Sequence, residues 1–314
     1  MRRKTVIVGA GHVGAHVASA LSMEEICEEI VLIDRDERKA WAHAQDIQDT
    51  AAYAGRTCVV RDGTWKELAD ADVCVISVCG KIFREDRLEE LDEALDIMDE
   101  LVPELARADF HGVIVSITNP CDLVALYLHE RTEYPVIGTG TALDSARFRV
   151  RIGRGLGLMP SCVEAFCVGE HGDSQVQVWS QARIGGRFLD ELAREEPERY
   201  GRLDRTAVEK STTEAGWAIL QGKGSTEYGI GAAAAEVIRA VLCDSRTVLP
   251  CSIPFRRTAG SALIYTSMPA IIGADGYPTP VPFRLNGAEQ AAFERSCQLL
   301  EKQRAEHLDP RLKG

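Results

Sequence analysis

Four short runs rich in valine and isoleucine divide the first half of the chain. They lie at residues 5–8, 30–33, 73–78 and 113–117. Apolar residues follow one another in these runs with little alternation, which is typical of parallel strands buried on both faces. Longer segments with helical periodicity separate the runs, at residues 13–21, 38–52 and 88–108. Alternating strands and helices predict an α/β fold with a doubly wound parallel sheet.

The pattern changes in the second half of the chain. Strand-like pieces are expected at residues 163–168, 183–184, 252–253 and 262–268. Helical patterns cover residues 203–221, 231–242 and 288–307. This mixture predicts an α+β second domain. No linker or low-complexity stretch marks the junction, and we place the two domains at residues 1–140 and 141–314.

Composition and charge restrict the class of protein. Apolar residues make up 45% of the 314 residues and charged residues 27%, as in an ordinary globular protein. No run approaches the roughly 18 apolar residues that cross a membrane. The basic N-terminus enters an apolar run that Gly9, Gly11 and Gly14 interrupt, so we expect a first strand and not a signal peptide. The net charge of −12 argues against nucleic acid as a partner. We expect a cytoplasmic protein.

The ten cysteines are scattered and form no C-x-x-C pair. Several, such as Cys74 and Cys167, lie inside apolar runs, where a reduced cysteine behaves as a small hydrophobic residue. We therefore expect structural thiols and no metal site.

A glycine-rich turn follows the first predicted strand. Its residues, Gly9-Ala10-Gly11-His12-Val13-Gly14, match G-x-G-x-x-G and open the first predicted helix. Backbone N–H groups and the helix dipole would then face a pyrophosphate. The second strand ends at Asp34, where a carboxylate accepts hydrogen bonds from ribose hydroxyls and repels the additional phosphate of NADP. Arg35 and Arg38 follow and weaken that repulsion slightly. We expect NAD as the cofactor; the alternative is a structural turn beside a solvated aspartate.

Polar segments in the middle of the chain carry the candidate chemistry. They are Asn119-Pro120-Cys121-Asp122, residues 143–149 and residues 169–174. His171 lies in a polar turn between Gly169 and Gly172, and an imidazole can transfer a proton near neutral pH. Asp144 is the candidate partner that would fix its tautomer, and Arg147 offers a planar fork for a substrate carboxylate. The alternative is a loop histidine beside a surface ion pair.

At these residues the chain resembles the L-lactate/malate dehydrogenase family. The pattern L-D-S-A-R-F-R followed by G-E-H-G-D-S is its most specific part. The resemblance extends over nearly the whole chain and includes the glycine motif, Asp34, the N-P-x-D turn, residues 223–226 and residues 268–273. It implies an NAD-dependent oxidoreductase that interconverts a small 2-oxo acid and its L-2-hydroxy acid, with a Rossmann domain before a catalytic domain.

The resemblance also implies roles for single residues. His171 would be the acid/base, Asp144 its orienting carboxylate and Arg147 the anchor of the substrate carboxylate. Asn119 would contact both the nicotinamide and the substrate oxygen, and Thr226 would line the substrate pocket. The implied cofactor contacts are Gly9, Gly11, Val13, Gly14, Asp34, Gly80 and Asn119.

Arg87 is expected to be a second catalytic cation that also touches the substrate, because Asp86-Arg87-Leu88 resembles the end of the family's mobile loop. In the family, a residue shortly before this arginine reads the substrate side chain: glutamine in lactate enzymes and arginine in malate enzymes. Counting back from Arg87 gives Lys81, whereas counting forward from Gly80 gives Phe83, because this loop is shorter. The residue that reads the side chain therefore stays open among residues 81–84.

The family default predicts pyruvate and L-lactate as the substrate pair. Ile82 or Phe83 in the pocket would favour a larger apolar side chain, as in L-2-hydroxyisocaproate dehydrogenases. Lys81 or Arg84 there would favour a dicarboxylate and malate dehydrogenase activity. A non-catalytic NAD-binding sensor is an alternative from another class. Because family members usually form dimers or tetramers, we also expect a homo-oligomer.

Overall fold

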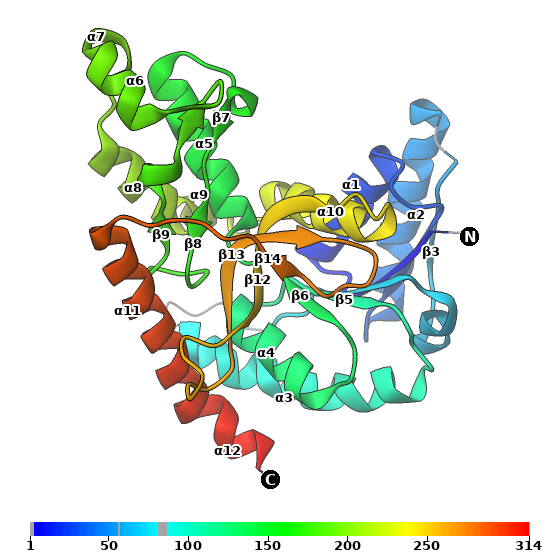
Figure 1. Ribbon diagram of the computed structural model, residues 1–314. Helices are drawn as coiled ribbons and strands as arrows, with labels where there is room; N and C mark the ends of the chain where they lie inside the picture. Colours follow the sequence, from blue (N-terminus) through cyan, green and yellow to red (C-terminus); the bar gives the residue numbers. More distant parts are fainter. Residues whose placement is uncertain (1–2, 56, 81–86, 314) are drawn as a thin grey trace.

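The computed structural model describes residues 3–55, 57–80 and 87–313, and its centre is a nine-stranded sheet in the order β14-β13-β12-β6-β5-β4-β1-β2-β3 (Figure 1). Six neighbouring strands run parallel: β1 (Lys4–Val8), β2 (Glu29–Ile33), β3 (Val59–Asp62), β4 (Val73–Ile76), β5 (Val113–Ser116) and β6 (Val136–Gly138). Every residue of β1, β2, β4 and β5 is buried, as the uninterrupted apolar runs predicted. The predicted α/β class with a doubly wound parallel sheet is confirmed.

Helices cover both faces of this sheet. They are α1 (His12–Met23), α2 (Glu37–Ala54), α3 (Arg87–Arg107), α4 (Cys121–Arg131) and α10 (Tyr228–Leu242), with the 3₁₀ turn η1 at Trp65–Asp70. Helix α1 packs on α2 and α10, whereas α3 packs on α4 on the opposite side (Figure 1). Asp36 begins α2 by accepting a hydrogen bond from the Lys39 N–H, and Gly55 ends it with a φ of 64°.

An arm projects from one end of the sheet (Figure 1). It contains α5 (Ala142–Leu156), α6 (Leu189–Glu195), α7 (Pro197–Tyr200) and α8 (Arg205–Thr213) with β7 (Val163–Glu164), β10 (Arg183–Ile184) and β11 (Arg187–Phe188). Phe148 and Trp179, in edge-to-face contact with centroids 4.8 Å apart, lie in a second and smaller apolar core. The remaining short elements of this half are η2 (Pro160–Cys162), β8 (Cys167–Val168), β9 (Val176–Gln177), η3 (Trp179–Gln181) and α9 (Ala215–Lys223).

The last part of the chain returns to the large sheet. Strands β12 (Thr247–Phe255), β13 (Ile264–Ile272) and β14 (Thr279–Pro280) extend it in antiparallel fashion, followed by α11 (Gly287–Gln303), η4 (Arg304–Leu308) and α12 (Asp309–Leu312). Ser252 of β12 pairs with Gly138 of β6. We expected these strands inside a separate α+β domain, yet they cover the open edge that β6 would otherwise expose.

Local patterns missed several boundaries. The helix expected at residues 203–221 is two helices, α8 and α9, and the strand expected at 163–168 is two short strands, β7 and β8. Helix α4 was not expected, because its residues 121–128 are all buried and leave no amphipathic pattern. Within the described residues, no helix has both the length and the apolar character needed to cross a membrane.

Candidate active site

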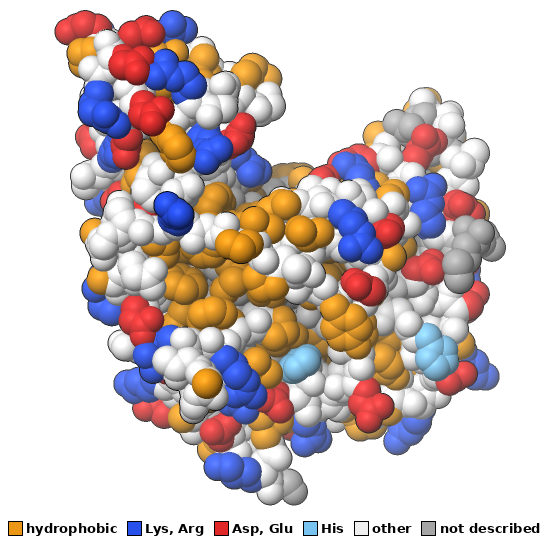
Figure 2. Space-filling model, viewed as in Figure 1, with side chains coloured by type: hydrophobic (Ala, Val, Ile, Leu, Met, Phe, Trp, Pro, Cys, Tyr) orange, Lys and Arg blue, Asp and Glu red, His pale blue; other side chains and the backbone are white. Residues whose placement is uncertain are grey.

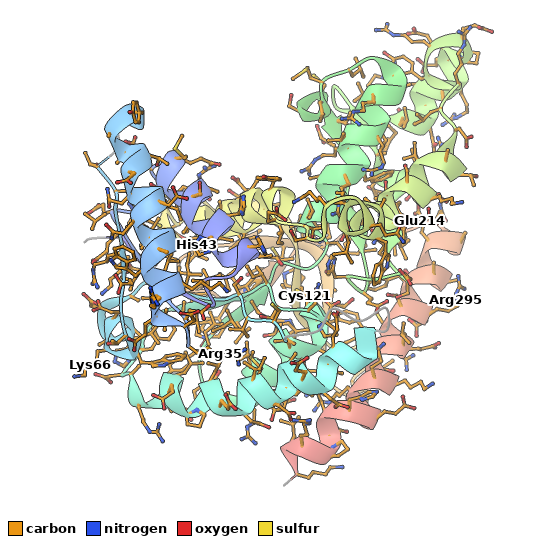
Figure 3. The ribbon with its side chains drawn as sticks, turned by 180° about the vertical axis from the view of Figure 1, so that it is seen from behind. Arg35, His43, Lys66, Cys121, Glu214 and Arg295 are labelled. Atoms are coloured by element: carbon orange, nitrogen blue, oxygen red, sulfur yellow. The ribbon has the colours of Figure 1, made fainter. Side chains whose placement is uncertain are left out.

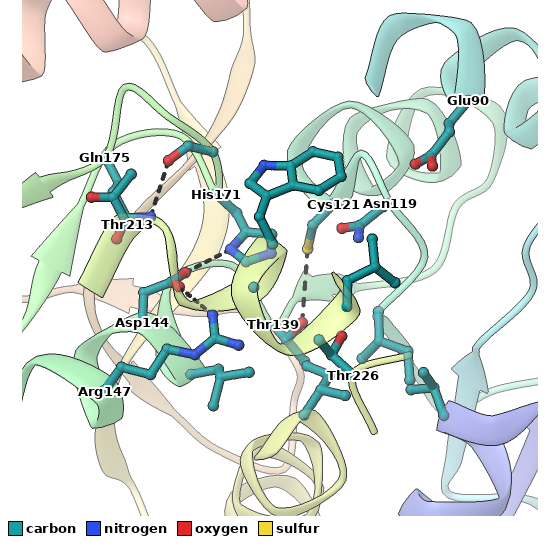
Figure 4. A pocket seen from close by; sticks show the side chains of 18 residues that line it. Glu90, Asn119, Cys121, Thr139, Asp144, Arg147, His171, Gln175, Thr213 and Thr226 are labelled. Atoms are coloured by element: carbon teal, nitrogen blue, oxygen red, sulfur yellow. Dashed lines mark hydrogen bonds and ion pairs between the residues drawn. The ribbon is translucent and has the colours of Figure 1, made fainter. Parts of the chain in front are cut away.

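His171 and Asp144 lie in direct contact, although they come from different elements. His171 belongs to the loop between β8 and β9, and Asp144 to the first turn of α5. His171 Nδ1 and Asp144 Oδ2 are 2.7 Å apart (Figure 4). A carboxylate at this nitrogen fixes the imidazole orientation and leaves Nε2 for another partner.

Arg147 completes the cluster from the same helix as Asp144. The two residues are three positions apart and therefore share a helix face. Arg147 Nη1 donates a hydrogen bond of 2.9 Å to Asp144 Oδ1, so each carboxylate oxygen has one cationic or titratable partner. The exposed fractions are 2% for the Asp144 side chain, 12% for Arg147 and 22% for His171. The carboxylate is thus sealed, while the two nitrogen-bearing groups can reach a ligand.

The surroundings of Asp144 keep it ionised. Burial alone would raise its pKa, but the charge and hydrogen bond of His171, followed by those of Arg147, lower the pKa below its ordinary value. A permanently charged carboxylate at Nδ1 stabilises the protonated imidazole. The cluster can therefore bind an anion at Arg147 and transfer a proton at His171.

A second buried carboxylate holds the backbone of His171. Asp122 Oδ2 accepts a hydrogen bond of 2.7 Å from the His171 N–H, and Asp122 Oδ1 accepts one from the Ser252 hydroxyl. The sequence had shown Asp122 in the N-P-C-D segment, but we assigned it no role. The signal was a charged residue at the start of an apolar segment, residues 121–128, which is buried throughout, so that it must have an internal partner.

Asp122 differs from Asp144 in the direction of its pKa shift. Burial raises its pKa to about 6, and nearby Glu170 acts in the same direction. The hydrogen bonds from Ser252 and the His171 backbone, and the charge of His171, only partly oppose the effect of burial. Two carboxylates on either side of one histidine therefore have shifts of opposite sign.

We predict that Asp122→Asn increases stability more at neutral than at acidic pH. Because the folded pKa lies above the unfolded one, the wild-type free energy of unfolding falls as pH rises from about 4 to about 6. Asparagine does not titrate, so its advantage over the wild type should grow by on the order of 2 kcal/mol across this range. Urea unfolding at pH 4.5 and pH 7.5 measures it, and a pH-independent difference would contradict the ionisation of Asp122.

One pocket collects most of the predicted catalytic residues. His171, Asp144, Arg147, Asn119 and Thr226 all line it (Figure 4). Seen from behind, Cys121 of the same lining lies near the centre of the molecule, between the arm and the first domain (Figure 3). The side chain of Arg87, at the start of α3, and residues 81–86 lie outside the described parts.

The pocket also contains residues to which we gave no role from the sequence. They are Glu90, Ile117, Cys121, Thr139, Leu143, Gly172, Gln175, Thr213, Gly216, Trp217, Leu220 and Ile230. Gly216, Trp217 and Leu220 come from α9 and form one wall. No motif marks them, because apolar and small residues at helical spacing are usually core residues.

A cleft beside this pocket contains most of the predicted cofactor contacts. Gly11, Val13, Gly80 and Asn119 line it together with Thr226. Val13, Asn119 and Thr226 belong to the cleft and the pocket at once. A ligand in the cleft would therefore lie next to His171.

The glycine motif shapes the cleft through sterics. Gly9 has a φ of +101°, and a Cβ there would lie 2.2 Å from the Ser77 carbonyl oxygen. A Cβ on Gly14 would lie 2.0 Å from the Gly9 carbonyl oxygen. At Gly11 the nearest atom would be Lys39 Nζ at 3.8 Å, so the turn is open on that side. Glycine is thus required at positions 9 and 14, where strand and helix meet. At Gly11 the turn is open, next to the start of α1.

The start of α1 suits a phosphate group. Its N-cap residue is Gly11, which has no side chain to cap the first turn, and this turn contains no acidic residue. N–H groups at such a helix start can bind an anion. Asp34 lies beside it: Oδ2 accepts a hydrogen bond of 2.8 Å from the Ala10 N–H, and Lys39 Nζ lies 3.8 Å from the same oxygen. N–H groups that can bind a phosphate, next to a carboxylate that can bind a ribose, fit a dinucleotide.

Comparisons with known proteins agree along the whole chain. Residues 3–137 match the family model described as lactate/malate dehydrogenase, NAD binding domain, and residues 141–310 match its alpha/beta C-terminal domain. The chain is 38% identical to an L-lactate dehydrogenase of Fusobacterium nucleatum, over 96% of this chain and 95% of that protein. It is 36% identical to one of Thermus aquaticus, over 95% and 97%.

Solved structures give the same result for the fold. The minor L-lactate dehydrogenase from Enterococcus mundtii superimposes with a TM-score of 0.91 at 31% identity, covering 98% of each chain. Malate dehydrogenase from Cryptosporidium parvum gives a TM-score of 0.90 at 26% identity, covering 98% of this chain and 99% of its own.

Proposed function

Because this chain belongs to the lactate/malate dehydrogenase family, we propose that it interconverts pyruvate and L-lactate. It is an NAD-dependent oxidoreductase that acts on the CH–OH group of 2-hydroxy acids. The observation that carries the proposal is the His171–Asp144–Arg147 cluster, which lines a pocket continuous with the dinucleotide cleft.

Each residue of the cluster has a separate role in the proposed reaction. Arg147 binds the substrate carboxylate through its planar fork. Protonated His171 donates a hydrogen bond from Nε2 to the 2-oxo oxygen and transfers the proton as negative charge develops there. Asp144 holds Nδ1 and stabilises the imidazolium. Asn119 lines both spaces and would contact substrate oxygen and nicotinamide. The nicotinamide, when bound, supplies the hydride for reduction and accepts it in oxidation.

The charges of the pocket favour a substrate with one carboxylate. Among the described residues of its lining, the cationic or titratable nitrogen groups are those of Arg147 and His171, and both have a role in the reaction. A second carboxylate would lie there without an opposite charge, which is costly in a buried site. A larger apolar side chain is the second candidate. A Cβ on Gly216 would meet its nearest atom, Arg147 Nη1, only at 3.9 Å, so this wall leaves room.

Steady-state kinetics with NADH test the proposal. We expect kcat/KM to be highest for pyruvate, lower for 2-oxoisocaproate and lowest for oxaloacetate. A preference for oxaloacetate would overturn the assignment in favour of malate dehydrogenase activity. Binding of NADH without turnover of any 2-oxo acid would indicate the non-catalytic sensor instead.

Arg87 is proposed as the second cation beside the substrate oxygen. We predict that Arg87→Gln lowers kcat for pyruvate reduction by about a hundredfold, because one group that stabilises developing negative charge is lost. KM should change far less, since Arg147 still binds the carboxylate. Michaelis–Menten kinetics of the variant give both parameters, and small changes in both would remove Arg87 from the catalytic residues.

The assembly, the location and the division into domains also belong to the proposal. A homo-oligomer, dimer or tetramer, is supported by an apolar area over β12, β13, β14 and α10 (Figure 2). Val248 of β12 is 50% exposed and Tyr228 of α10 is 68% exposed. Size-exclusion chromatography with light scattering tests the assembly. A cytoplasmic location and domains at residues 1–140 and 141–314 stay predictions.

A further inference from the structure

Two buried glutamines lie behind the catalytic loop. Gln175 and Gln177 are each 9% exposed, and Gln177 ends β9. Gln175 Nε2 donates a hydrogen bond of 3.0 Å to the Gly172 carbonyl oxygen. Gln177 Nε2 donates to Gln175 Oε1 at 3.3 Å and to Thr213 Oγ1 at 3.1 Å. Three side chains therefore form one hydrogen-bonded chain that ends on the carbonyl of Gly172, the residue after His171.

The direction of this chain is set by a single backbone group. The Gly172 carbonyl can only accept, so Gln175 must present its amide nitrogen to it. The Gln175 oxygen then faces Gln177, which must in turn present its nitrogen. Thr213 accepts from that nitrogen. No other orientation of the two amides satisfies all three contacts, so the bridge has one stable arrangement.

The bridge joins the two sides of the substrate pocket. One end is fixed at Gly172, next to His171, and both Gly172 and Gln175 line the pocket (Figure 4). The other end is Thr213, the last residue of α8, which also lines the pocket. Helix α9 begins two residues later and supplies a wall of the pocket, yet only its Ala215 is buried. A helix with so little buried surface depends on hydrogen bonds of the neighbouring segments to keep its position.

We propose that Gln177 is a positioning residue for the reaction, which fixes the distance between the His171 loop and the wall formed by α9. It acts through Gln175 on the catalytic side and through Thr213 on the helix side. The inference rests on the proposed oxidoreductase function and adds a residue that does not line the substrate pocket. Gln177 also lines a surface groove, together with residues of α11. In a variant without the Gln177 amide, water from that groove can solvate the Gln175 oxygen and the Thr213 hydroxyl. The protein should therefore still fold.

The test compares Gln177→Met, which keeps the length of the side chain, with Thr213→Val and Thr213→Ser. We expect Gln177→Met to lower the single-turnover rate of NADH oxidation by pyruvate about tenfold, as the loss of a buried hydrogen bond implies. KM should change less than kcat. Thr213→Val should give a similar loss and Thr213→Ser should restore the rate, because serine keeps the accepting oxygen. The double variant Gln177→Met/Thr213→Val should be no slower than the slower single variant.

Gln48→Met is the matched control. Gln48 Oε1 accepts a hydrogen bond of 2.6 Å from the Val60 N–H, far from the pocket on α2. Its loss should lower the midpoint of thermal unfolding and leave the single-turnover rate unchanged. A wild-type rate in Gln177→Met, or losses in the two single variants that multiply in the double variant, would overturn the positioning role. Failure of the proposed function has a different signature, since the wild type itself would then oxidise NADH with none of the 2-oxo acids.

Discussion

Replacement of His171 by glutamine is expected to lower kcat for pyruvate reduction by about three orders of magnitude. Glutamine can still donate a hydrogen bond to the substrate oxygen but cannot release a proton, and general acid catalysis contributes typically 10²–10⁴-fold. Asp144, which lies 2.7 Å from His171 Nδ1, would then have no imidazolium to stabilise. Binding of NADH, measured by fluorescence, should stay near the wild-type value because the glycine turn and Asp34 are untouched.

The pH dependence distinguishes acid catalysis from simple damage to the pocket. In the proposed mechanism, reduction requires the protonated imidazole, so kcat/KM of the wild type for pyruvate should fall as the imidazole loses its proton at higher pH. Oxidation of L-lactate should show the opposite slope. Both slopes should vanish in His171→Gln. His129→Gln is the control, because His129 is a half-buried histidine of α4 outside the pocket. An unchanged pH slope in the His171 variant would assign the proton transfer to another group.

The two carboxylates beside His171 have the same formal charge but pKa shifts of opposite direction. Asp144 has a lowered pKa because the charges of His171 and Arg147 outweigh its burial. Asp122 has a raised pKa because its partners are a hydroxyl and a backbone N–H, which offset burial only partly. Asp144, which contacts the imidazole ring, therefore carries its negative charge at a lower pH than Asp122 does, and there it stabilises the imidazolium. The backbone N–H of His171 is bound by Asp122, which becomes protonated at a higher pH than Asp144.

The sequence indicated the parts of this protein that depend on short-range patterns. The strands β1, β2, β4 and β5 were visible as apolar runs, and the glycine turn was visible because its spacing reflects contacts within one strand and one helix. His171, Asp144 and Arg147 were proposed as site residues from motif resemblance and polar context. Their distances were not predictable, since His171 and Asp144 are 27 positions apart and only the fold brings them together.

Other features depend on contacts that no local pattern records. Asp122 gains its role through Ser252, which is 130 positions away along the chain. Gln177 resembles any polar strand residue until Thr213 is placed beside it. The residues of β12 and β13 do not show that β12 pairs with β6 and extends the large sheet, because the edge that it covers belongs to a distant segment. Each of these features depends on packing between segments that are distant in the sequence.

Replacement of Arg147 by glutamine is the second change expected to have a large effect. It should lower kcat/KM for pyruvate by about three orders of magnitude, since removing one partner of a buried, hydrogen-bonded charge pair costs 2–5 kcal/mol or more. The loss has two sources. The substrate carboxylate loses its anchor, and Asp144 loses the donor at Oδ1, which lies 2.9 Å from Arg147 Nη1. KM for pyruvate should therefore rise steeply while kcat also falls.

Arg147→Lys separates charge from geometry at this position. Lysine keeps a positive charge but cannot form two parallel hydrogen bonds with a carboxylate, so its kcat/KM should lie between those of the wild type and Arg147→Gln. Arg304→Gln is the matched control, because the Arg304 side chain is 14% exposed against 12% for Arg147 and pairs with Glu130 and Asp309 away from the pocket. It should lower stability and leave KM unchanged. If Arg147→Lys matches the wild type, a point charge suffices and the planar fork has no part in binding the substrate; if Arg147→Gln does so, the carboxylate binds elsewhere.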